Sequence, residues 1–323
     1  MATATPAPAP SGDITAPAAR AAPAHKGKRR PPRPVKEWLT AYGFIAPSFL
    51  GVLAFLLLPV IAVFVLSLFK WNLLGDPSFV GLDNFSRMVR DEEVRHSLLI
   101  TFEYVLLNIP LQTVLALLLA LFLNRKLRGI KVFRVLFVLP WMATPIAMAI
   151  IWQWIFDPAR GSLNGFLNLF GIPGQPWLSS ETWALLAVAA VNIWQYTGYN
   201  ALFFLAGLQN IPDYLDEAAR LDGAGPVRQF FSITLPLLRP TLFFVLVTSV
   251  IGSFQVFDTV YAMTKGGPGE ATNVLNYEIY NRAFKFFDAG YASTIALLLF
   301  AVIVAITALQ SWYFHNRTVY DLS

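Results

Sequence analysis

The sequence predicts an all-α membrane protein whose chain crosses the bilayer as six helices. Its composition is the first indication: 56% of the 323 residues are hydrophobic and only 13% are charged, whereas a soluble domain carries about a quarter charged residues. The second is a pattern of six long windows without a charged side chain. Most of these windows reach the roughly 20 apolar residues that a membrane-spanning helix needs.

Residues 1–37 are predicted to be a disordered, basic, cytoplasmic tail. They are rich in Ala and Pro and become basic toward residue 36, without apolar periodicity. The apolar run that follows is too long for a signal peptide, and further spans come after it. The basic residues either bind anionic lipid or orient the first span, and the second explanation needs fewer assumptions.

Residues 38–323 form the membrane domain. Prolines occur within its apolar windows, and membrane helices tolerate them because neighbouring groups satisfy the freed backbone. We predict the spans at about 39–69, 99–123, 133–156, 183–208, 240–263 and 291–314.

Lysine and arginine predict the orientation. With the N-terminus in the cytoplasm, 16 of the 24 basic residues fall in inside segments and 8 in outside loops. Because positive charge is enriched on the cytoplasmic side, we expect both termini and the polar loop 209–239 to be cytoplasmic. The same distribution explains the pI of about 9.4 without nucleic-acid binding.

The sequence contains no sign of an enzyme. There are no cysteines, and the three histidines are scattered, so no catalytic, metal-binding or cofactor-binding set is predicted. A nucleotide-binding glycine loop is also missing from the sequence, so the chain is not expected to hold ATP phosphates itself.

The loop 209–239 is predicted to dock a soluble partner. Acidic residues follow Pro212, Gly223 and Gly225 supply a reversal, and Pro226 starts a second helix that Leu235-Pro236 should end. Such a helix–turn–helix could lie in a partner's groove. The alternative, an amphipathic hairpin on the membrane surface, would need more basic residues.

The loop contains Glu217-Ala218-Ala219, Asp222-Gly223-Ala224 and Ile233-Thr234-Leu235-Pro236. In these motifs it resembles the EAA loop of ABC importer permeases, specifically those of carbohydrate importers for maltose, lactose or glycerol-3-phosphate. It extends from about residue 38 to the end through further stretches: Gly43-Phe44-Ile45-Ala46-Pro47, Phe79-Val80-Gly81-Leu82-Asp83-Asn84-Phe85, Gly266-Gly267-Pro268 and Gly290-Tyr291-Ala292-Ser293.

The resemblance implies a MetI-like fold with cytoplasmic EAA coupling helices, in the cytoplasmic (inner) membrane. It implies that the ATPase-coupling residues are Glu217, Ala218, Ala219, Asp222 and Gly223. The implied partners are two ABC ATPase subunits, a second and different permease, an extracytoplasmic solute-binding protein, a sugar or polyol, and membrane lipid. The expected mechanism is alternating access. The rival is an ion-coupled secondary transporter, which would usually have more intramembrane acids or an evident repeat.

A path for the solute is predicted in the fourth and fifth spans. Asn192, Tyr196 and Tyr199 share one helical face, and the fifth span offers Ser249, Ser253 and Gln255. The alternative role for such residues is hydrogen bonding between helices. Glu103 and Asp258 are the only acids near span interiors; Glu103 is expected to reach the interface, and for Asp258 both a structural and a transport role stay open.

Overall fold

A computed structural model describes residues 35–125 and 127–315, and the chain divides into two compact units, Met1–Leu56 and Leu57–Ser323. The predicted tail lies outside the described residues except for its last three, which begin the first helix. The regions described are mostly helical.

The first unit contains helix α1 (Val35–Val52), with Pro47 inside it, and most of the π-helical turn η1 (Leu53–Leu57). Its large apolar side chains are exposed; Phe44 and Phe55 are more than four-fifths exposed. A helix that is apolar on all sides is typical of a helix surrounded by lipid.

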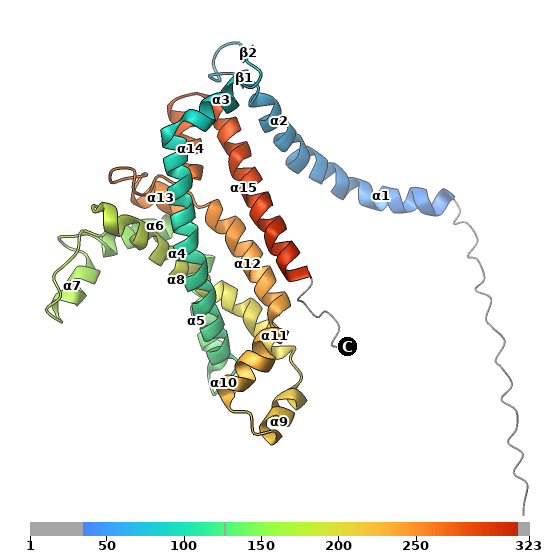
Figure 1. Cartoon of the computed structure of the whole chain (residues 1–323), viewed down its shortest axis with the longest axis vertical. Helices are drawn as coiled ribbons and strands as arrows, with labels where there is room; N and C mark the ends of the chain where they lie inside the picture. The colour runs from blue at the N-terminus through green and yellow to red at the C-terminus, as the bar shows by residue number, and fades with distance from the viewer. Residues whose placement is uncertain (1–34, 126, 316–323) are drawn as a thin grey trace, which may run out of the picture. The chain divides into compact units, whose positions relative to one another are not determined.

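The second unit contains the remaining helices and one two-stranded antiparallel ribbon (Figure 1). The elements preceding the polar loop are α2 (Leu58–Leu66), β1 (Phe69–Lys70), β2 (Ser78–Phe79), α3 (Asp83–Arg90), α4 (Glu92–Leu123), α5 (Ile130–Met142), α6 (Pro145–Ile155), α7 (Ser162–Asn168) and α8 (Glu181–Gln209). The loop and the rest of the unit form α9 (Asp213–Leu221), α10 (Pro226–Gln229), η2 (Phe230–Thr234), α11 (Leu235–Leu237), α12 (Arg239–Phe254), α13 (Asp258–Met263), α14 (Leu275–Tyr280), η3 (Asn281–Lys285) and α15 (Ala289–His315).

The core of this unit forms where α8 packs against α4 and α5, and where α12 packs against α4 and α15 (Figure 1). Small residues permit the close approaches. A Cβ at Gly198 of α8 would collide with the carbonyl of Phe137 on α5, and one at Gly207 would meet the hydroxyl of Thr241 on α12. Alanines fill the α4–α8 contact, where Ala116, Ala120 and Ala201 are fully buried.

Length and composition identify four described helical segments able to cross a membrane: Tyr42–Leu66, Glu92–Leu123, Arg239–Met263 and Ala289–His315. A fifth results if α5 and α6, which meet at 95°, count as one span. The sequence predicted that pair as one continuous span over 133–156. The long helix α8 is not among the apolar ones, because polar residues such as Asn192, Gln195 and Asn200 interrupt its centre.

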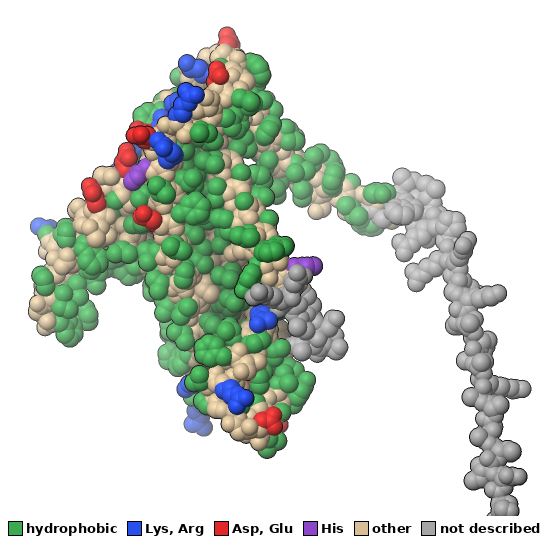
Figure 2. Space-filling view, viewed as in Figure 1, with side chains coloured by type: hydrophobic (Ala, Val, Ile, Leu, Met, Phe, Trp, Pro, Cys, Tyr) green, Lys and Arg blue, Asp and Glu red, His purple; other side chains and the backbone are tan. Residues whose placement is uncertain are grey.

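Charged side chains of this unit gather at two ends. One group lies over α3 and the start of α4, the other over α9 and α10, and the surface between them is largely hydrophobic (Figure 2). This is the distribution that a bilayer imposes on a spanning protein.

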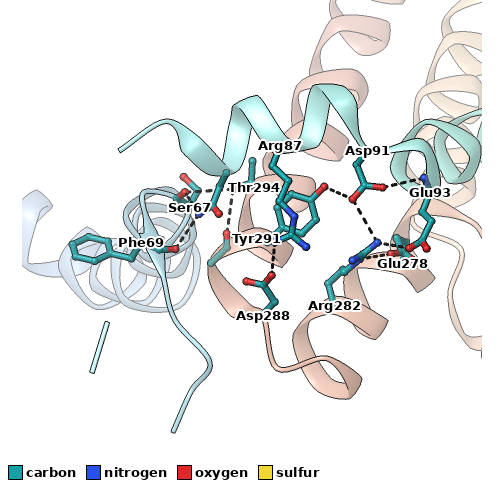
Figure 3. Close-up of polar contacts among 12 residues, drawn as sticks. Ser67, Phe69, Arg87, Asp91, Glu93, Glu278, Arg282, Asp288, Tyr291 and Thr294 are labelled. Carbon is teal, nitrogen blue, oxygen red and sulfur yellow. Dashed lines mark hydrogen bonds and ion pairs between the residues drawn. The ribbon is translucent and has the colours of Figure 1, made fainter. Parts of the chain in front are cut away.

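A cluster of charged residues, here called the outer clamp, joins α3, α4, η3 and α15 (Figure 3). Asp91 caps α4 by accepting hydrogen bonds from the backbone N–H groups of Glu93 and Val94. Its other oxygen accepts a 2.6 Å hydrogen bond from the Tyr291 hydroxyl. The clamp comprises Arg87, Asp91, Glu93, Glu278, Arg282, Asp288 and Tyr291.

Arg282 is the cation at the centre of the clamp. It bonds Glu278 at 2.5 Å, lies 3.5 Å from Asp91 and contacts Glu93. Arg87 pairs with Asp288 at 2.7 Å, and its guanidinium lies 3.8 Å above the Tyr291 ring. Apart from the Arg282–Glu278 pair, whose residues are four apart, these contacts connect segments about 200 residues apart in the sequence.

The pKa of Asp91 reflects this setting. Burial would raise the pKa, but the Tyr291 hydrogen bond, the charge of Arg282 and the capped N–H groups outweigh it and leave the pKa below its usual value. Because the pKa of Asp91 is lower in the folded state than the unfolded-state value of about 3.9, its carboxylate stabilises the fold fully at pH values above about 3.9. This stabilisation is lost as the pH falls through the lowered folded-state pKa.

Motif residues near the clamp have direct structural roles. The Asn84 amide donates to the carbonyls of Ser67 and Phe69 at 2.8 and 3.0 Å. Gly290 lies against the Phe69 carbonyl, where no side chain fits. Thr294 donates to the Ser67 carbonyl at 3.4 Å. The turn between α2 and β1 is therefore held from both α3 and α15.

Gly198→Ala tests the close approach of α8 and α5. The added Cβ meets backbone, which cannot rotate away, so we expect a loss of about 1–3 kcal/mol in stability. Thermal unfolding of the detergent-solubilised protein measures it. Gly165→Ala on α7 is the control, since nothing lies within 4 Å of its Cβ position. Equal melting temperatures for the two variants would contradict this packing.

Arg282→Ala tests the clamp. It leaves the carboxylate of Glu278, whose side chain is 3% exposed, without its cation, and we expect a loss of about 3 kcal/mol. Arg95→Ala is the control, because the Arg95–Glu92 pair is exposed on both sides and contributes at most about 0.5 kcal/mol. Chemical denaturation followed by tryptophan fluorescence compares them; a small effect at Arg282 would mean that the clamp is dispensable.

Candidate functional site

A cavity of about 340 Å³ lies between α4, α8 and α12, bordered by the α5–α6 break and the start of α13. All six residues of the predicted solute path line it, so the two helical faces chosen from the sequence meet around one space. The residues are Asn192, Tyr196, Tyr199, Ser249, Ser253 and Gln255.

The inner wall of the cavity is formed by side chains that make hydrogen bonds between α4, α8 and α12. The Asn108 amide donates to the Ser253 hydroxyl at 2.9 Å. The Asn200 amide donates to Gln112 at 3.1 Å and to the Ser249 hydroxyl at 3.2 Å. These five side chains are all at least nine-tenths buried. Ser249 and Ser253 therefore bind α12 to α8 and α4 while also bordering the cavity.

The outer wall is more accessible. Asn192, Tyr196 and Tyr199 are partly exposed and Gln255 is exposed. Trp141 stacks on Tyr199, with ring centroids 4.3 Å apart and an interplanar angle of 12°. This wall offers a flat aromatic surface beside amide and hydroxyl groups, which is the combination that holds a polar ligand with apolar faces.

The break between α5 and α6 brings Trp141 and Pro145 into the wall. Ala143 and Thr144 are extended there, so the two helices do not continue into each other. The Gln195 amide of α8 donates to the freed Ala143 carbonyl at 3.3 Å. Tolerance of Pro140 and Pro145 within a span was predicted from the sequence, but the sharp bend and its partner Gln195 were not.

Sequence reasoning missed several lining residues. Asn108 and Gln112 are four residues apart in an apolar window, a spacing that places both on one helical face; that signal was present. Trp141 and Thr259 had no comparable signal, because their places depend on the break and on the turn before α13. Asp258, left open from the sequence, also lines the cavity.

One acceptor in the inner wall is unsatisfied. The Oδ1 atom of Asn108 is buried and has no hydrogen-bond partner among the described residues. Buried polar groups are normally paired, so this oxygen is an exception within the inner wall.

The polar loop forms a closed helical hairpin. Gly223, with φ of +75°, ends α9: the N–H of Ala224 bonds the Ala219 carbonyl at 2.9 Å, and that of Gly223 bonds the Arg220 carbonyl at 3.1 Å. This pair of bonds is a Schellman stop. The Gln229 amide donates to the Asp216 carboxylate at 2.8 Å, which holds α10 against α9.

The predicted coupling residues differ in exposure. Glu217, Ala218, Asp222 and Gly223 are exposed, whereas Ala219 is buried. The Ala219 side chain is therefore not part of the surface that the hairpin offers to a partner. Large apolar side chains that the sequence reasoning passed over are exposed on the hairpin: Tyr214, Leu221, Val227 and Phe231.

Two local expectations about the loop were wrong. From the sequence, Pro212 was expected as the first helical residue, with Asn210 or Ile211 as the cap; instead Pro212 is itself the N-cap residue and α9 begins at Asp213. Leu235-Pro236 does not end the second helix, because the π-helical turn η2 precedes Pro236 and the helical path continues through Leu237. A wider turn of this kind accommodates a residue without an N–H donor.

The described residues contain no group of three or more His, Cys, Asp or Glu side chains placed to hold a metal ion. Glu103 is exposed on α4 and borders a separate shallow pocket with Glu181.

Comparisons with known proteins agree with this architecture. A family model described as the binding-protein-dependent transport system inner membrane component matches residues 112–318. A probable ABC transporter permease, YesP of Bacillus subtilis, is 39% identical and covers 88% of this chain and 94% of its own. The sn-glycerol-3-phosphate permease UgpA of Agrobacterium fabrum is 36% identical over 86% of this chain and 96% of its own.

A third relative is the trehalose/maltose permease MalF of Thermococcus litoralis, 35% identical over 84% of this chain and 92% of its own. Among solved structures, a chain of a bacterial alginate ABC transporter has a TM-score of 0.78 at 21% identity, covering 87% of this chain and 96% of that one. At that identity the likeness concerns the fold.

Asn200→Ala tests the inner wall. It removes two interhelical hydrogen bonds and leaves the Ser249 hydroxyl oxygen and the Gln112 side-chain carbonyl oxygen without this donor, so we expect a loss of about 1–2 kcal/mol. Thermal unfolding in detergent is the measurement. Asn168→Ala, at an exposed position on α7, should leave the melting temperature unchanged. A neutral Asn200→Ala would mean that these contacts do not hold α8 in place.

Proposed function

Because this chain belongs to the family of binding-protein-dependent transport system inner membrane components, we propose that its cavity carries a sugar or related polyol across the membrane. The chain is a multi-pass inner-membrane permease subunit of an ABC importer, not an enzyme, and such an importer works with a solute-binding protein. Membership of this family argues against the alternative that the chain is an ion-coupled secondary transporter.

The cavity is the observation that carries the cargo assignment. Its amide and hydroxyl groups can bond a polyol's hydroxyl groups, and the stacked Trp141 and Tyr199 offer a surface for the apolar face of a sugar ring. The residues assigned to the path are Asn192, Tyr196, Tyr199, Ser249, Ser253 and Gln255. Relatives named for glycerol-3-phosphate and for trehalose and maltose support a cargo of this chemical class.

The proposed topology has six spans with both termini in the cytoplasm. The apolar helices and the bent α5–α6 pair supply five, and α8 supplies the sixth. Its 29 residues are long enough, and its polar side chains face other helices instead of lipid. In this topology residues 1–37 anchor the first span on the cytoplasmic side, and the hairpin within 209–239 is cytoplasmic.

The hairpin is proposed to couple transport to ATP hydrolysis on a separate subunit. Glu217, Ala218, Asp222 and Gly223 form its exposed contact, whereas Ala219 is buried. The hairpin directly joins α8 to α12, the two helices that carry the path residues. Movement of a docked ATPase would therefore be transmitted to the cavity walls, as alternating access requires.

The proposed assembly contains two ATPase subunits, a second and different permease, and the binding protein. In the bilayer the exposed apolar side chains of the single chain would contact lipid or the second permease. ATP binding would close the ATPase pair, and closure would reorient α8 and α12 about the cavity.

Glu217→Lys tests the coupling role. Reversing an exposed charge at the contact should lower ATP-driven sugar uptake into proteoliposomes at least about tenfold, since charge complementarity is replaced by repulsion. The assembled transporter with its binding protein is required. Glu92→Lys, which reverses an exposed carboxylate at the opposite end of the unit, is the control. Normal uptake by an assembled Glu217→Lys transporter would refute the assignment, and uptake without any ATPase subunit would refute the proposed class of transport.

A further inference from the structure

Asp258 places an unpaired carboxylate on the cavity wall. It is the first residue of α13, is partly exposed, and lines the cavity beside Gln255 and Thr259. Among the described residues, no ion pair or hydrogen bond involves its carboxylate. Within a membrane such a group is costly, so its presence commonly marks a functional site.

The local fold does not require this charge. Phe257, not a carboxylate, is the N-cap residue of α13. Neighbouring residues make the tertiary bonds: the Asn192 amide donates to the Thr259 hydroxyl at 3.2 Å, and the Asn276 amide donates to the Gln255 carbonyl at 2.9 Å. The helix dipole favours an acid in the first turn, but this interaction leaves both carboxylate oxygens free to accept from a ligand.

The acids of the outer clamp are paired with arginines. Glu278 and Asp91 have Arg282, and Asp288 has Arg87. The cavity lining, in contrast, contains no Lys or Arg among the described residues, and Asp258 is its one acid. The nearby ionisable group that interacts with Asp258 is the Tyr196 hydroxyl. The cavity is therefore negative and has no cation to neutralise a second negative charge.

The free acceptor capacity of Asp258 adds a second argument. Its partly exposed carboxylate has no donor among the described residues and needs hydrogen-bond donors from a ligand. The hydroxyl groups of a neutral sugar supply donors, and a carboxylate accepting from them forms charge-assisted bonds. An ionised phosphate, sulfonate or carboxylate offers acceptors and a like charge at the same place.

We propose, building on the sugar-transport function above, that Asp258 makes the cavity selective for uncharged sugars and polyols. It accepts hydrogen bonds from the cargo's hydroxyl groups and repels anionic sugars, so one residue provides both attraction and rejection. Relatives bear names for both kinds of cargo, glycerol-3-phosphate and trehalose/maltose; this cavity fits the uncharged kind.

The absence of cysteine from the chain gives a direct test. Gln255→Cys puts a single thiol on the exposed wall of the cavity, three residues from Asp258. In the assembled transporter in proteoliposomes, the thiol is labelled by two methanethiosulfonates, the anionic sulfonatoethyl and the cationic trimethylammonium-ethyl reagent. Intact mass of this chain gives the two rates, so cysteines of other subunits do not interfere.

Adding Asp258→Asn should raise the anion-to-cation rate ratio about tenfold, as removal of one nearby charge in a partly enclosed site predicts. Glu103→Gln is the matched control, because it removes a carboxylate that borders a separate pocket, and the ratio should stay within about twofold. The ratio of the two labelling rates depends on the electrostatic potential in the cavity, so the loss of a purely structural role of Asp258 would not change it. An unchanged ratio in the Asp258→Asn chain overturns the proposal.

Protection of the same thiol tests cargo selection. Maltitol and maltobionate differ mainly in charge, and labelling by the neutral hydroxyethyl reagent reports on both. We expect maltitol to protect the chain carrying Asp258 at concentrations at least about tenfold below those of maltobionate, and the two to protect equally after Asp258→Asn. Equal protection by maltitol and maltobionate in the chain that carries Asp258 overturns the proposed selectivity for uncharged cargo. Protection by neither, with the charge ratio still shifted, overturns the sugar assignment and leaves the electrostatic part standing.

Discussion

Hydrogen bonds between α4, α8 and α12 are the constraint on which the rest of this structure depends. Lipid tails are as apolar as leucine, so hydrophobic burial does not hold membrane helices together, and polar contacts and close packing do so instead. Asn108 and Asn200 make those contacts to two serines of α12. The same side chains border the cavity, so the residues that hold the helices together also shape the space between them.

The second unit has tightly bonded structures on both sides of the cavity. The outer clamp joins α3, α4, η3 and α15 through Arg282 and Tyr291. The hairpin is closed by its glycine stop and by the Gln229–Asp216 bond. Between them the cavity wall is less tightly bonded, with partly exposed tyrosines, an unsatisfied Asn108 oxygen and an unpaired Asp258. The partly exposed tyrosines and the unpaired Asp258 thus leave hydrogen-bonding capacity where a ligand would be bound.

Much of this arrangement was predictable from residue types and spacing. The face formed by Asn192, Tyr196 and Tyr199 and the two serines of α12 follow from helical periodicity, and all of them reach one cavity. The α9–α10 reversal follows from Gly223, whose positive φ few other residues adopt without strain.

The rest depends on contacts that periodicity does not encode. At the 95° bend between α5 and α6, the freed Ala143 carbonyl accepts a hydrogen bond from the amide of Gln195, 52 residues further along the chain. The burial of Ala219, beside the exposed Glu217 and Ala218, also depends on tertiary packing. Of the predicted six spans, α8 has too polar a centre to be recognised by hydropathy among the described helices; its polar groups find partners only in the folded bundle.

That polar centre has a consequence for biogenesis. A helix that carries Asn192, Gln195 and Asn200 in its middle partitions poorly into lipid by itself. Its partner Gln112 belongs to α4, and the Ala143 carbonyl that Gln195 binds follows α5, both of which leave the ribosome earlier than α8. Because of the order of synthesis, the hydrogen-bond partners Gln112 and the Ala143 carbonyl are already in place when α8 enters the bilayer. A circularly permuted chain in which α8 precedes α4 would lack these partners at that moment.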